Sequence, residues 1–331
     1  MKAQWVDYQS PLATWIKRYL AYKRALGRRF DNEEKTLRLL DRYLVEEGIS
    51  HIGDITLQRI ESFMISRPRK RARSYNHLLG VTRGLFDWLL LQEVIDHSPV
   101  CTRSRRVTTQ RVPFIFDHLQ ARKLLEVAAK LPDNFRALDR GNAYEMIFAL
   151  LYGLGLRVGE VARLCIKDVD FARQLLMIHH TKFSKSRLVP FGPQIMKRLG
   201  GYLKLRTEQY GPLQPNQPVF SFGKGSNKAI HPCTISQVFH ALIPKLGLTI
   251  PEGSSPPRLH DLRHSFAVGT LLRWYRTGLN PSQRLIHLST FMGHVDPTST
   301  AVYLTITADL LQEANQRFGR FATPLLREVA L

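Results

Sequence analysis

Six side chains in the C-terminal half of this 331-residue chain are of the kinds that hold and break a phosphodiester. In chain order they are Arg157, Lys182, His260, Arg263, His294 and Tyr303. Cations and imidazoles stabilise the negative charge that grows on phosphate oxygens during displacement. A tyrosine hydroxyl supplies a nucleophile that needs no metal ion. The set therefore indicates covalent strand transfer on a nucleic-acid backbone.

Arg157 follows the apolar segment 146–152 and a pair of glycines, so it is expected at a turn between two helices. Glu160 comes three residues later, and one helical turn allows it to pair with the guanidinium and hold it in one rotamer. The nearby glycines do not indicate a dinucleotide site. Their last interval is one residue too long, and the segment before them has a helical rather than a strand pattern.

His260 and Arg263 are three residues apart, which on a helix places both side chains on one face. Leu262 and Phe266 lie on the opposite face and are expected to anchor this helix in the core. A second imidazole, His264, is interpreted as structural.

Tyr303 lies nine residues after His294, within the apolar run 301–304. A tyrosine in such a run is more often packed in a core. Its place after the arginines and histidines favours the other interpretation, in which Tyr303 is the nucleophile.

Four segments resemble the motifs of the tyrosine recombinase (phage integrase-like) family. They are Gly-Leu-Arg-Val-Gly-Glu at 155–160, Thr-Lys-Phe-Ser-Lys-Ser-Arg-Leu-Val-Pro at 181–190, His-Asp-Leu-Arg-His-Ser-Phe-Ala at 260–267, and Met-Gly-His at 292–294 followed by Tyr303. They are similar to the first-arginine box, the lysine turn, the His-x-x-Arg box, and the third box with its nucleophile. In the lysine turn, Thr181 and Phe183 stand where glycines are common. Lys182 is taken as the catalytic lysine and Lys185 as the alternative.

The resemblance, which covers about residues 113–318, implies a site-specific DNA recombinase or integrase. Tyr303 would attack the scissile phosphate, giving a 3′-phosphotyrosyl intermediate and a free 5′-hydroxyl. Arg157, Arg263 and His294 would bind the non-bridging oxygens, His260 would help take the phenol proton, and Lys182 would protonate the leaving oxygen. Strands would be exchanged through a Holliday junction without metal, ATP or other cofactor. Two DNA sites would be held by a tetramer, and a mobile element, as in transposition, is the expected context.

The elements that must position these groups indicate two domains. Residues 1–101 are expected to form an N-terminal helical core-binding domain, residues 102–112 a basic linker, and residues 113–331 the catalytic domain. The catalytic part is expected to be α+β, mainly helical with a small β-hairpin sheet in 175–191, where two short apolar runs flank a polar turn. With the helical domain it would form a two-domain, C-shaped clamp on DNA. The segment after Tyr303 is expected to be a C-terminal helix for protomer exchange, with Leu310, Leu311, Ala314 and Phe318 on one face, and docking in cis is the open alternative.

The balance of charge indicates a polyanionic partner. The chain has 48 Lys+Arg against 27 Asp+Glu, a net charge of +21. A basic membrane-surface protein is the alternative, but it should concentrate its charge on one amphipathic helix, whereas here both halves are basic. The expected partner is double-stranded DNA. The side chains expected to contact its backbone are Lys17, Arg18, Lys23, Arg24, Arg28, Arg29, Arg67, Arg69, Lys70, Arg71, Arg73, Arg103, Arg105 and Arg106.

The cysteines Cys101, Cys165 and Cys233 lie far apart and predict neither a disulfide framework nor a zinc site, which fits a reducing compartment. No apolar run reaches the roughly 18 residues of a membrane span. The expectation is a cytoplasmic, nucleoid-associated protein that assembles with itself or with related recombinases, and not on a membrane.

Three other functions stay open. A type IB topoisomerase-like enzyme would nick and reseal without exchanging strands. A DNA-binding architectural protein would retain the catalytic set in an idle form. A metal-dependent nuclease would use His179, His180, His287 or His294, although the sequence offers no matching carboxylate cluster.

Overall fold

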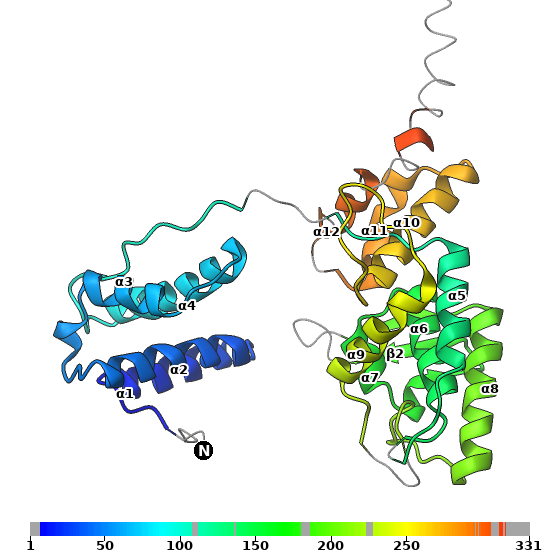
Figure 1. The fold of residues 1–331 in the computed structure, drawn as a ribbon, viewed down its shortest axis with the longest axis horizontal. Helices are drawn as coiled ribbons and strands as arrows, with labels where there is room; N and C mark the ends of the chain where they lie inside the picture. The colour runs from blue at the N-terminus through cyan, green and yellow to red at the C-terminus, as the bar shows by residue number, and fades with distance from the viewer. Residues whose placement is uncertain are drawn as a thin grey trace, which may run out of the picture. The chain divides into compact units, whose positions relative to one another are not determined.

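A computed structural model describes residues 7–107, 112–135, 137–179, 186–222, 228–294, 296, 298–305, 311–313 and 315. The chain divides into two compact units, Met1–Gln110 and Arg111–Leu331. Most of the described residues are helical, and one small sheet lies in the second unit (Figure 1). The predicted fold class, mainly α with a small sheet, is confirmed.

The first unit is a set of helices around one apolar core. Its described elements are α1 (Ala13–Ala25), α2 (Asp31–Glu46), a 3-10 turn η1 (Ile52–Asp54), α3 (Leu57–Ser66) and α4 (Ala72–Leu91). Leucines at helical spacing in α2, Leu37, Leu40 and Leu44, are fully buried because they share the face that meets α4. Trp88 of α4 lies beside the aromatic rings of α1.

The helix starts in this unit show what local patterns predict. Thr56 caps α3, since its hydroxyl accepts the backbone N–H of Arg59. Asp31, followed three residues later by Glu34, has the spacing of a capping box, but a cap at Asp31 predicted from this spacing is wrong. Asp31 is the first helical residue of α2, and the cap position is occupied by Phe30 in a left-handed conformation.

The second unit contains the remaining helices and the sheet. Its described elements are α5 (His118–Ala129), α6 (Arg140–Gly153), α7 (Val158–Arg163), η2 (Ile166–Asp168), β1 (Val169–Asp170), β2 (Leu175–Ile178), β3 (Arg187–Pro190), α8 (Pro193–Tyr210), α9 (Pro232–Leu242), η4 (Ile243–Leu246), α10 (Asp261–Arg276), α11 (Pro281–Met292), α12 (Thr298–Ala301) and η5 (Val302–Thr305). Helix α6 is apolar on every side and is buried along residues 146–151. Helices α5, α8 and α10 pack around it.

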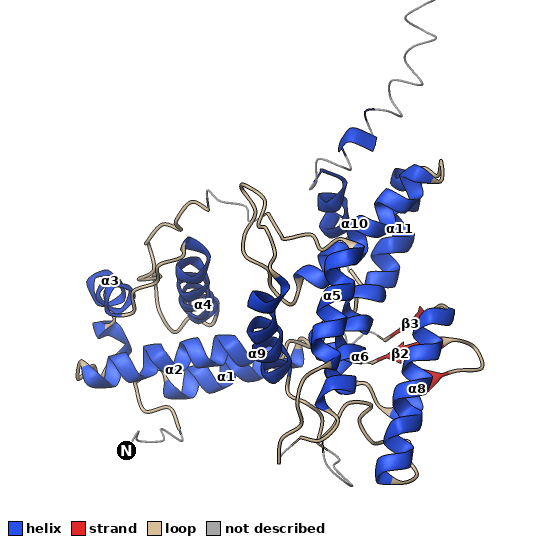
Figure 2. Cartoon of the chain, turned by 45° about the vertical axis from the view of Figure 1, so that its right-hand side comes forward, coloured by secondary structure: helices blue, strands red, loops and turns tan. Residues whose placement is uncertain are grey.

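The sheet is antiparallel with strand order β1-β2-β3, and β2 and β3 are the red strands labelled in Figure 2. Leu176 pairs with Val189, and both are buried, whereas Met177 and Leu188 point outward. The predicted hairpin is confirmed, and β1 is an addition to it. Because side chains alternate along a strand, Arg187 shares the inward face of β3 with Val189.

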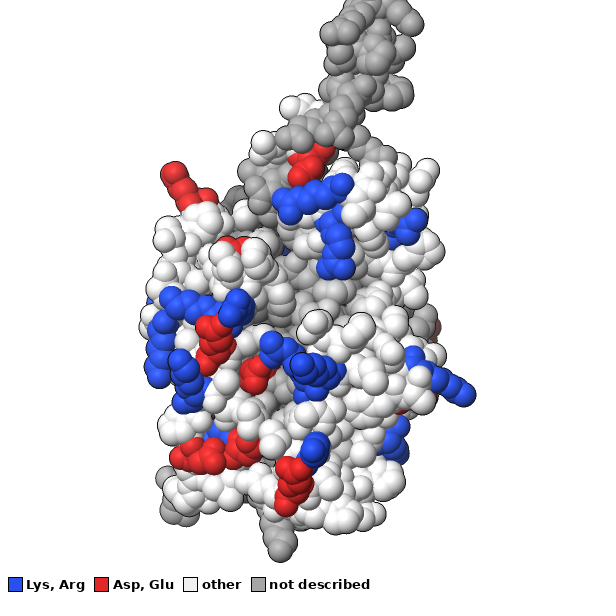
Figure 3. Space-filling model, turned by 90° about the vertical axis from the view of Figure 1, so that its right-hand side faces the viewer, with Lys and Arg blue, Asp and Glu red and all other residues white. Residues whose placement is uncertain are grey.

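Charge on the second unit is mixed over the face on which α8 lies. Figure 3 shows acidic and basic side chains side by side there, with no unbroken basic surface among the described residues. Arg198 and Lys204 of α8 are examples of basic side chains with an acidic neighbour, because Arg198 pairs with Glu145 and Lys204 with Glu208. Within the described residues, no helix has both the length and the apolar character that a membrane crossing requires.

Candidate active site

Arg157 is the cap residue of α7, at the turn between two helices that its sequence predicts. The turn needs Gly155, which has a φ of +59° and whose missing Cβ leaves room for the Phe266 ring. Glu160 anchors Arg157 in two ways. Its Oε2 accepts the Arg157 backbone N–H at 2.9 Å, and its Oε1 accepts an Nη1 proton at 2.8 Å. Glu160 is therefore a supporting group that sets the guanidinium's direction.

Arg263 lies in the first turn of α10 and is only 2% exposed. Its two terminal nitrogens donate to backbone carbonyls, one to Gly155 at 2.5 Å and one to Met292 at 2.7 Å. The Nη2 of Arg157 donates to the carbonyl of Gly293 at 2.9 Å. Both arginines therefore meet at the C-terminal end of α11.

His294 follows that helix end directly. Its Nδ1 is 2.6 Å from the hydroxyl of Thr300, a fully buried residue of α12. When Nδ1 accepts the hydroxyl proton, Nε2 carries the hydrogen and becomes the free donor of the ring.

Tyr303 lies in η5 and is buried, and its hydroxyl is 2.7 Å from Nδ1 of His264. The ring of His260 is in edge contact with that of His264, with centroids 4.8 Å apart. Burial raises the pKa of the Tyr303 phenol, and the nearby charges of Arg263 and Arg157 oppose that shift. The hydroxyl is thus held beside the histidines and within the field of both arginines.

The three histidines of the site are neutral at pH 7. Burial, followed by the surrounding cations, lowers the pKa of His260 and of His294 to about 4. Burial and the adjacent His260 ring lower the pKa of His264 to about 3. These shifts follow from placing imidazoles in buried positions among guanidinium groups.

The charged groups of the site have a positive excess. Burial opposes ionisation of Glu160, but the hydrogen bonds and charges of Arg187 and Arg157 lower its pKa to about 2. Burial and the charge of Arg157 lower the pKa of Arg263 to about 9, which leaves it charged at pH 7. Three guanidinium groups, those of Arg157, Arg187 and Arg263, lie near the one carboxylate of Glu160, and this excess of positive charge suits a phosphate anion.

Comparison with known proteins identifies the family to which this geometry belongs. The sequence profile of the phage integrase family matches residues 115–309, more than half of the chain. This chain belongs to the phage integrase family of tyrosine recombinases.

Proteins similar in sequence to this recombinase are named integrases or recombinases. The integrase/recombinase y4rB of Sinorhizobium fredii is 37% identical over 63% of this chain and 66% of its own length. A second protein of that organism, y4rE, is 29% identical over 91% and 94%. The tyrosine recombinase XerC of Oceanobacillus iheyensis is 25% identical over 82% and 83%. Members of this family are site-specific DNA recombinases, and the present chain is one of them.

Two solved structures share the fold of the recombinase. The Tn1549 transposon integrase in complex with transposon right end DNA matches with a TM-score of 0.64, at 16% identity, over 93% of this chain and 98% of that one. A lambda integrase dimer bound to a core site matches with a TM-score of 0.62, at 18% identity, over 88% and 76%.

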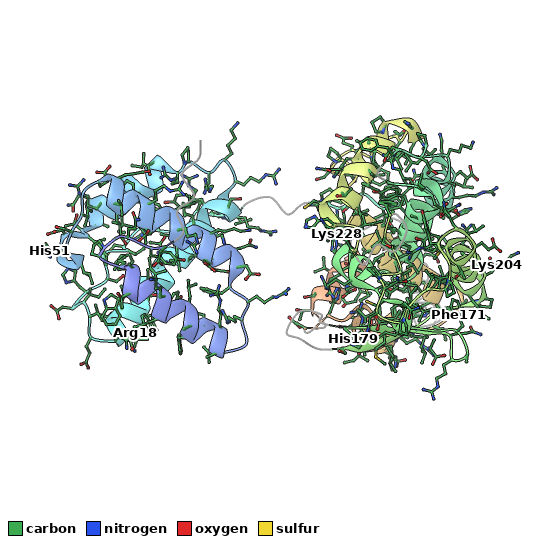
Figure 4. All side chains as sticks on the ribbon, turned by 90° about the horizontal axis from the view of Figure 1, so that it is seen from below. Arg18, His51, Phe171, His179, Lys204 and Lys228 are labelled. Carbon is green, nitrogen blue, oxygen red and sulfur yellow. The ribbon has the colours of Figure 1, made fainter. Side chains whose placement is uncertain are left out.

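Five of the six predicted catalytic residues lie in the described part of the recombinase. Arg157 and Arg263 contact the end of α11, which His294 follows, and His260 and Tyr303 both contact His264. Lys182 and its alternative Lys185 lie outside the described residues, as do Leu310, Ala314 and Phe318 of the predicted C-terminal helix. His179, labelled in Figure 4, directly follows β2, and its Nε2 is 3.1 Å from Oδ1 of Asp168. In the described part of the chain, no group of three or more His, Cys, Asp or Glu could hold a metal ion.

The predicted DNA-contacting residues all lie in the first unit, on exposed or half-buried positions. Several have additional contacts. Lys17 pairs with Asp7, Arg24 with Glu34, and Arg67 with Glu46. Arg105 stacks over the Tyr75 ring, and Arg18, labelled in Figure 4, over Trp15.

Three residues of the site make contacts that the sequence interpretation does not assign. His264, which is expected to be structural, has its Nδ1 2.7 Å from the Tyr303 hydroxyl. Thr300 orients His294, and Arg187 holds Glu160. A local signal existed only for Arg187, as a basic residue at the end of the lysine turn, because the other two contacts join separate helices.

Proposed function

We propose that this tyrosine recombinase breaks and rejoins specific DNA sites through a 3′-phosphotyrosyl bond at Tyr303. The observation that supports this most is the convergence of Arg157, Arg263 and His294 on one helix end, with the Tyr303 hydroxyl held at the neighbouring histidines.

In the proposed reaction, the Tyr303 oxygen forms a bond to phosphorus and the bond from phosphorus to the 5′-oxygen breaks. His260 helps take the phenol proton, and Lys182, with Lys185 as the alternative, protonates the leaving oxygen. Each guanidinium has five N–H donors, so Arg157 and Arg263 retain protons for the non-bridging oxygens beyond those given to α11. His264 holds the hydroxyl at rest, so this hydrogen bond breaks when the Tyr303 oxygen bonds to phosphorus.

Strand exchange follows from the covalent link, which conserves the energy of the broken phosphodiester. A 5′-hydroxyl from a partner duplex then reverses the step, and two such exchanges through a Holliday junction recombine two sites. Such a scheme needs four protomers, of this chain alone or with related recombinases. The solved lambda integrase tetramer bound to a Holliday junction has this fold, with a TM-score of 0.61 at 17% identity.

The proposed organisation assigns residues 1–101 to core-site binding, 102–112 to a basic linker and 113–331 to catalysis, the two domains closing on DNA as a clamp. The basic side chains of the first unit contact phosphates and set position rather than sequence. The Tn1549 relationship in fold favours a mobile element as the context. The enzyme would then act on DNA in the cytoplasm, at the nucleoid.

The test is to incubate the full chain with nicked suicide duplexes made from the DNA that flanks its own gene, and to map any covalent attachment. Wild type should give an adduct at Tyr303, in the presence of EDTA as well. Tyr303→Phe should abolish the adduct and change duplex affinity less than about threefold, since a single hydroxyl is lost. Tyr275→Phe, a half-buried tyrosine of α10, is the control and should react normally.

The same assay separates the alternatives. An adduct that persists in Tyr303→Phe would mean that another residue is the nucleophile. An adduct without Holliday junctions on paired sites would favour the topoisomerase-like enzyme. Binding without any adduct in wild type would favour the architectural protein, and loss of cleavage in EDTA would favour the nuclease.

A further inference from the structure

Arg187 begins β3, five residues after Lys182 in the sequence, and its side chain is 10% exposed. A buried guanidinium costs free energy unless its N–H groups are matched by acceptors. Arg187 meets this condition through groups that belong to two other segments of the site.

The first partner is Glu160. Nη1 and Nη2 of Arg187 donate to the two carboxylate oxygens at 2.8 and 2.9 Å, a bidentate arrangement. The same two oxygens also accept from Arg157, one from its backbone and one from its guanidinium. Glu160 therefore lies between two arginines, and Arg187 supplies the charge that balances it.

The second partner is the end of α11. Nε of Arg187 donates to the carbonyl of Phe291 at 2.9 Å. The next two carbonyls, of Met292 and Gly293, accept from Arg263 and Arg157. The last carbonyls of a helix lack partners within the helix and form its negative pole, so three guanidinium groups satisfy them in turn.

We propose that Arg187 is a positioning residue for phosphate binding: it balances the charge of Glu160 and fixes the end of α11, so that Arg157 and His294 face the scissile phosphate. This inference rests on the proposed function of the site. With Arg187 in place, Glu160 does not cancel the charge of Arg157, and the site keeps its excess of positive charge. Without Arg187, Glu160 has one guanidinium left, that of Arg157, and the Phe291 carbonyl loses a donor.

An ordinary buried ion pair would stabilise the fold and leave the chemistry unchanged once the protein is folded. The two roles therefore differ in what happens when Glu160 is neutralised as well. If Arg187 acts by balancing that carboxylate, Glu160→Gln should restore activity to the arginine variant.

The experiment measures single-turnover adduct formation, duplex affinity and thermal unfolding of the full chain on the mapped DNA site. Arg187→Met should slow adduct formation at least about a hundredfold, the size expected when a charge-stabilising group is misplaced, with affinity within about threefold. The double variant Arg187→Met, Glu160→Gln should react at least about tenfold faster than Arg187→Met. Arg173→Met, an exposed arginine in the turn between β1 and β2, is the matched control and should react like wild type.

Arg187→Lys keeps the charge but cannot reach both carboxylate oxygens and the Phe291 carbonyl, and it should slow the reaction about tenfold. Arg187→Lys tests the positioning role of Arg187 if Arg187→Met fails to fold. A lysine variant as fast as wild type, or a double variant no faster than the single one, would overturn the proposal.

A 5′-phosphorothiolate substrate tests the remaining possibility, that Arg187 acts by placing Lys182. The leaving group of this substrate needs no proton, so the substrate restores activity only to variants that have lost the proton donor. It should therefore not rescue Arg187→Met, and a rescue would overturn the assignment of Arg187 to phosphate binding. Failure of wild type and Arg173→Met to form any adduct would instead count against the proposed function itself.

Discussion

At the scale of single residues, the chemistry of the site depends on which atoms of each side chain are already hydrogen-bonded within the protein and which can bind a substrate. His294 and His264 each use Nδ1 within the protein, for Thr300 and Tyr303 respectively. Both rings are neutral at pH 7, because burial among cations lowers their pKa. A neutral imidazole binds phosphate only through the nitrogen that carries the hydrogen, so its internal partner sets its chemistry.

Thr300→Val tests this for His294. The variant keeps the shape of a fully buried side chain but removes the hydroxyl, so Nδ1 loses its partner and the favoured tautomer changes. Adduct formation should slow about tenfold, which corresponds to about 1.4 kcal/mol, with little change in duplex affinity. Thr290→Val, which removes an exposed hydroxyl from α11, is the control. Equal rates for the two variants in a single-turnover assay would show that Thr300 does not orient His294.

At the scale of elements, the C-terminal end of α11 organises the site. It offers three successive carbonyls to three arginines and then turns sharply at Gly293, which has a φ of +67°. A Cβ at that position would lie 2.8 Å from Nη1 of Arg187. Glycine is therefore needed here both for the backbone conformation and for the close approach of the guanidinium.

Gly293→Ala should consequently have two effects. The left-handed backbone costs about 1–2 kcal/mol of unfolding free energy, and the added methyl displaces Arg187 and slows adduct formation. Gly278→Ala separates the effects, because Gly278 has a φ of +75° at a helix end, and an added methyl there would meet no described atom within 4 Å. Chemical denaturation should show similar losses for both variants, while only Gly293→Ala should react more slowly. Similar reaction rates would assign the whole effect to backbone strain.

At the scale of the whole molecule, the basic side chains that give the net charge of +21 differ from place to place in how many acidic side chains lie beside them. On the face of the second unit where α8 lies, basic side chains alternate with acidic ones (Figure 3). The first unit has a basic cluster around the start of α4, comprising Arg67, Arg69, Lys70, Arg71 and Arg73, in which Arg67 pairs with Glu46. Basic side chains that contact phosphates release counterions from DNA.

Replacing that cluster by glutamine should therefore weaken duplex binding and make it less sensitive to salt. Each phosphate contact that is lost should reduce the slope of log K against log salt by about 0.9. A control variant with Arg198→Gln and Lys204→Gln on α8 should leave the slope unchanged, since both residues have acidic partners. The slopes are obtained from duplex affinities measured between roughly 50 and 200 mM salt, the range over which phosphate contacts dominate binding. An unchanged slope in the cluster variant would remove these residues from the DNA interface.

Much of this site could be predicted from the sequence because the rules involved are local. Turn glycines, the pairing of Arg157 with Glu160, the three-residue spacing of His260 and Arg263, and the alternation in the hairpin depend on neighbours within one helical turn or one strand. These patterns were sufficient to predict the helical class, the small sheet and the chemical type of the site.

Tertiary structure alone decided which atoms meet. The three arginines that bind the end of α11 come from positions 136, 29 and 104 residues away from their acceptors. Those acceptors are backbone carbonyls, which every residue type has, so no sequence pattern marks them. For the same reason the choice of His264 as the partner of Tyr303, and the place of Arg187 beside Glu160, follow from the packing of separate elements and not from spacing along the chain.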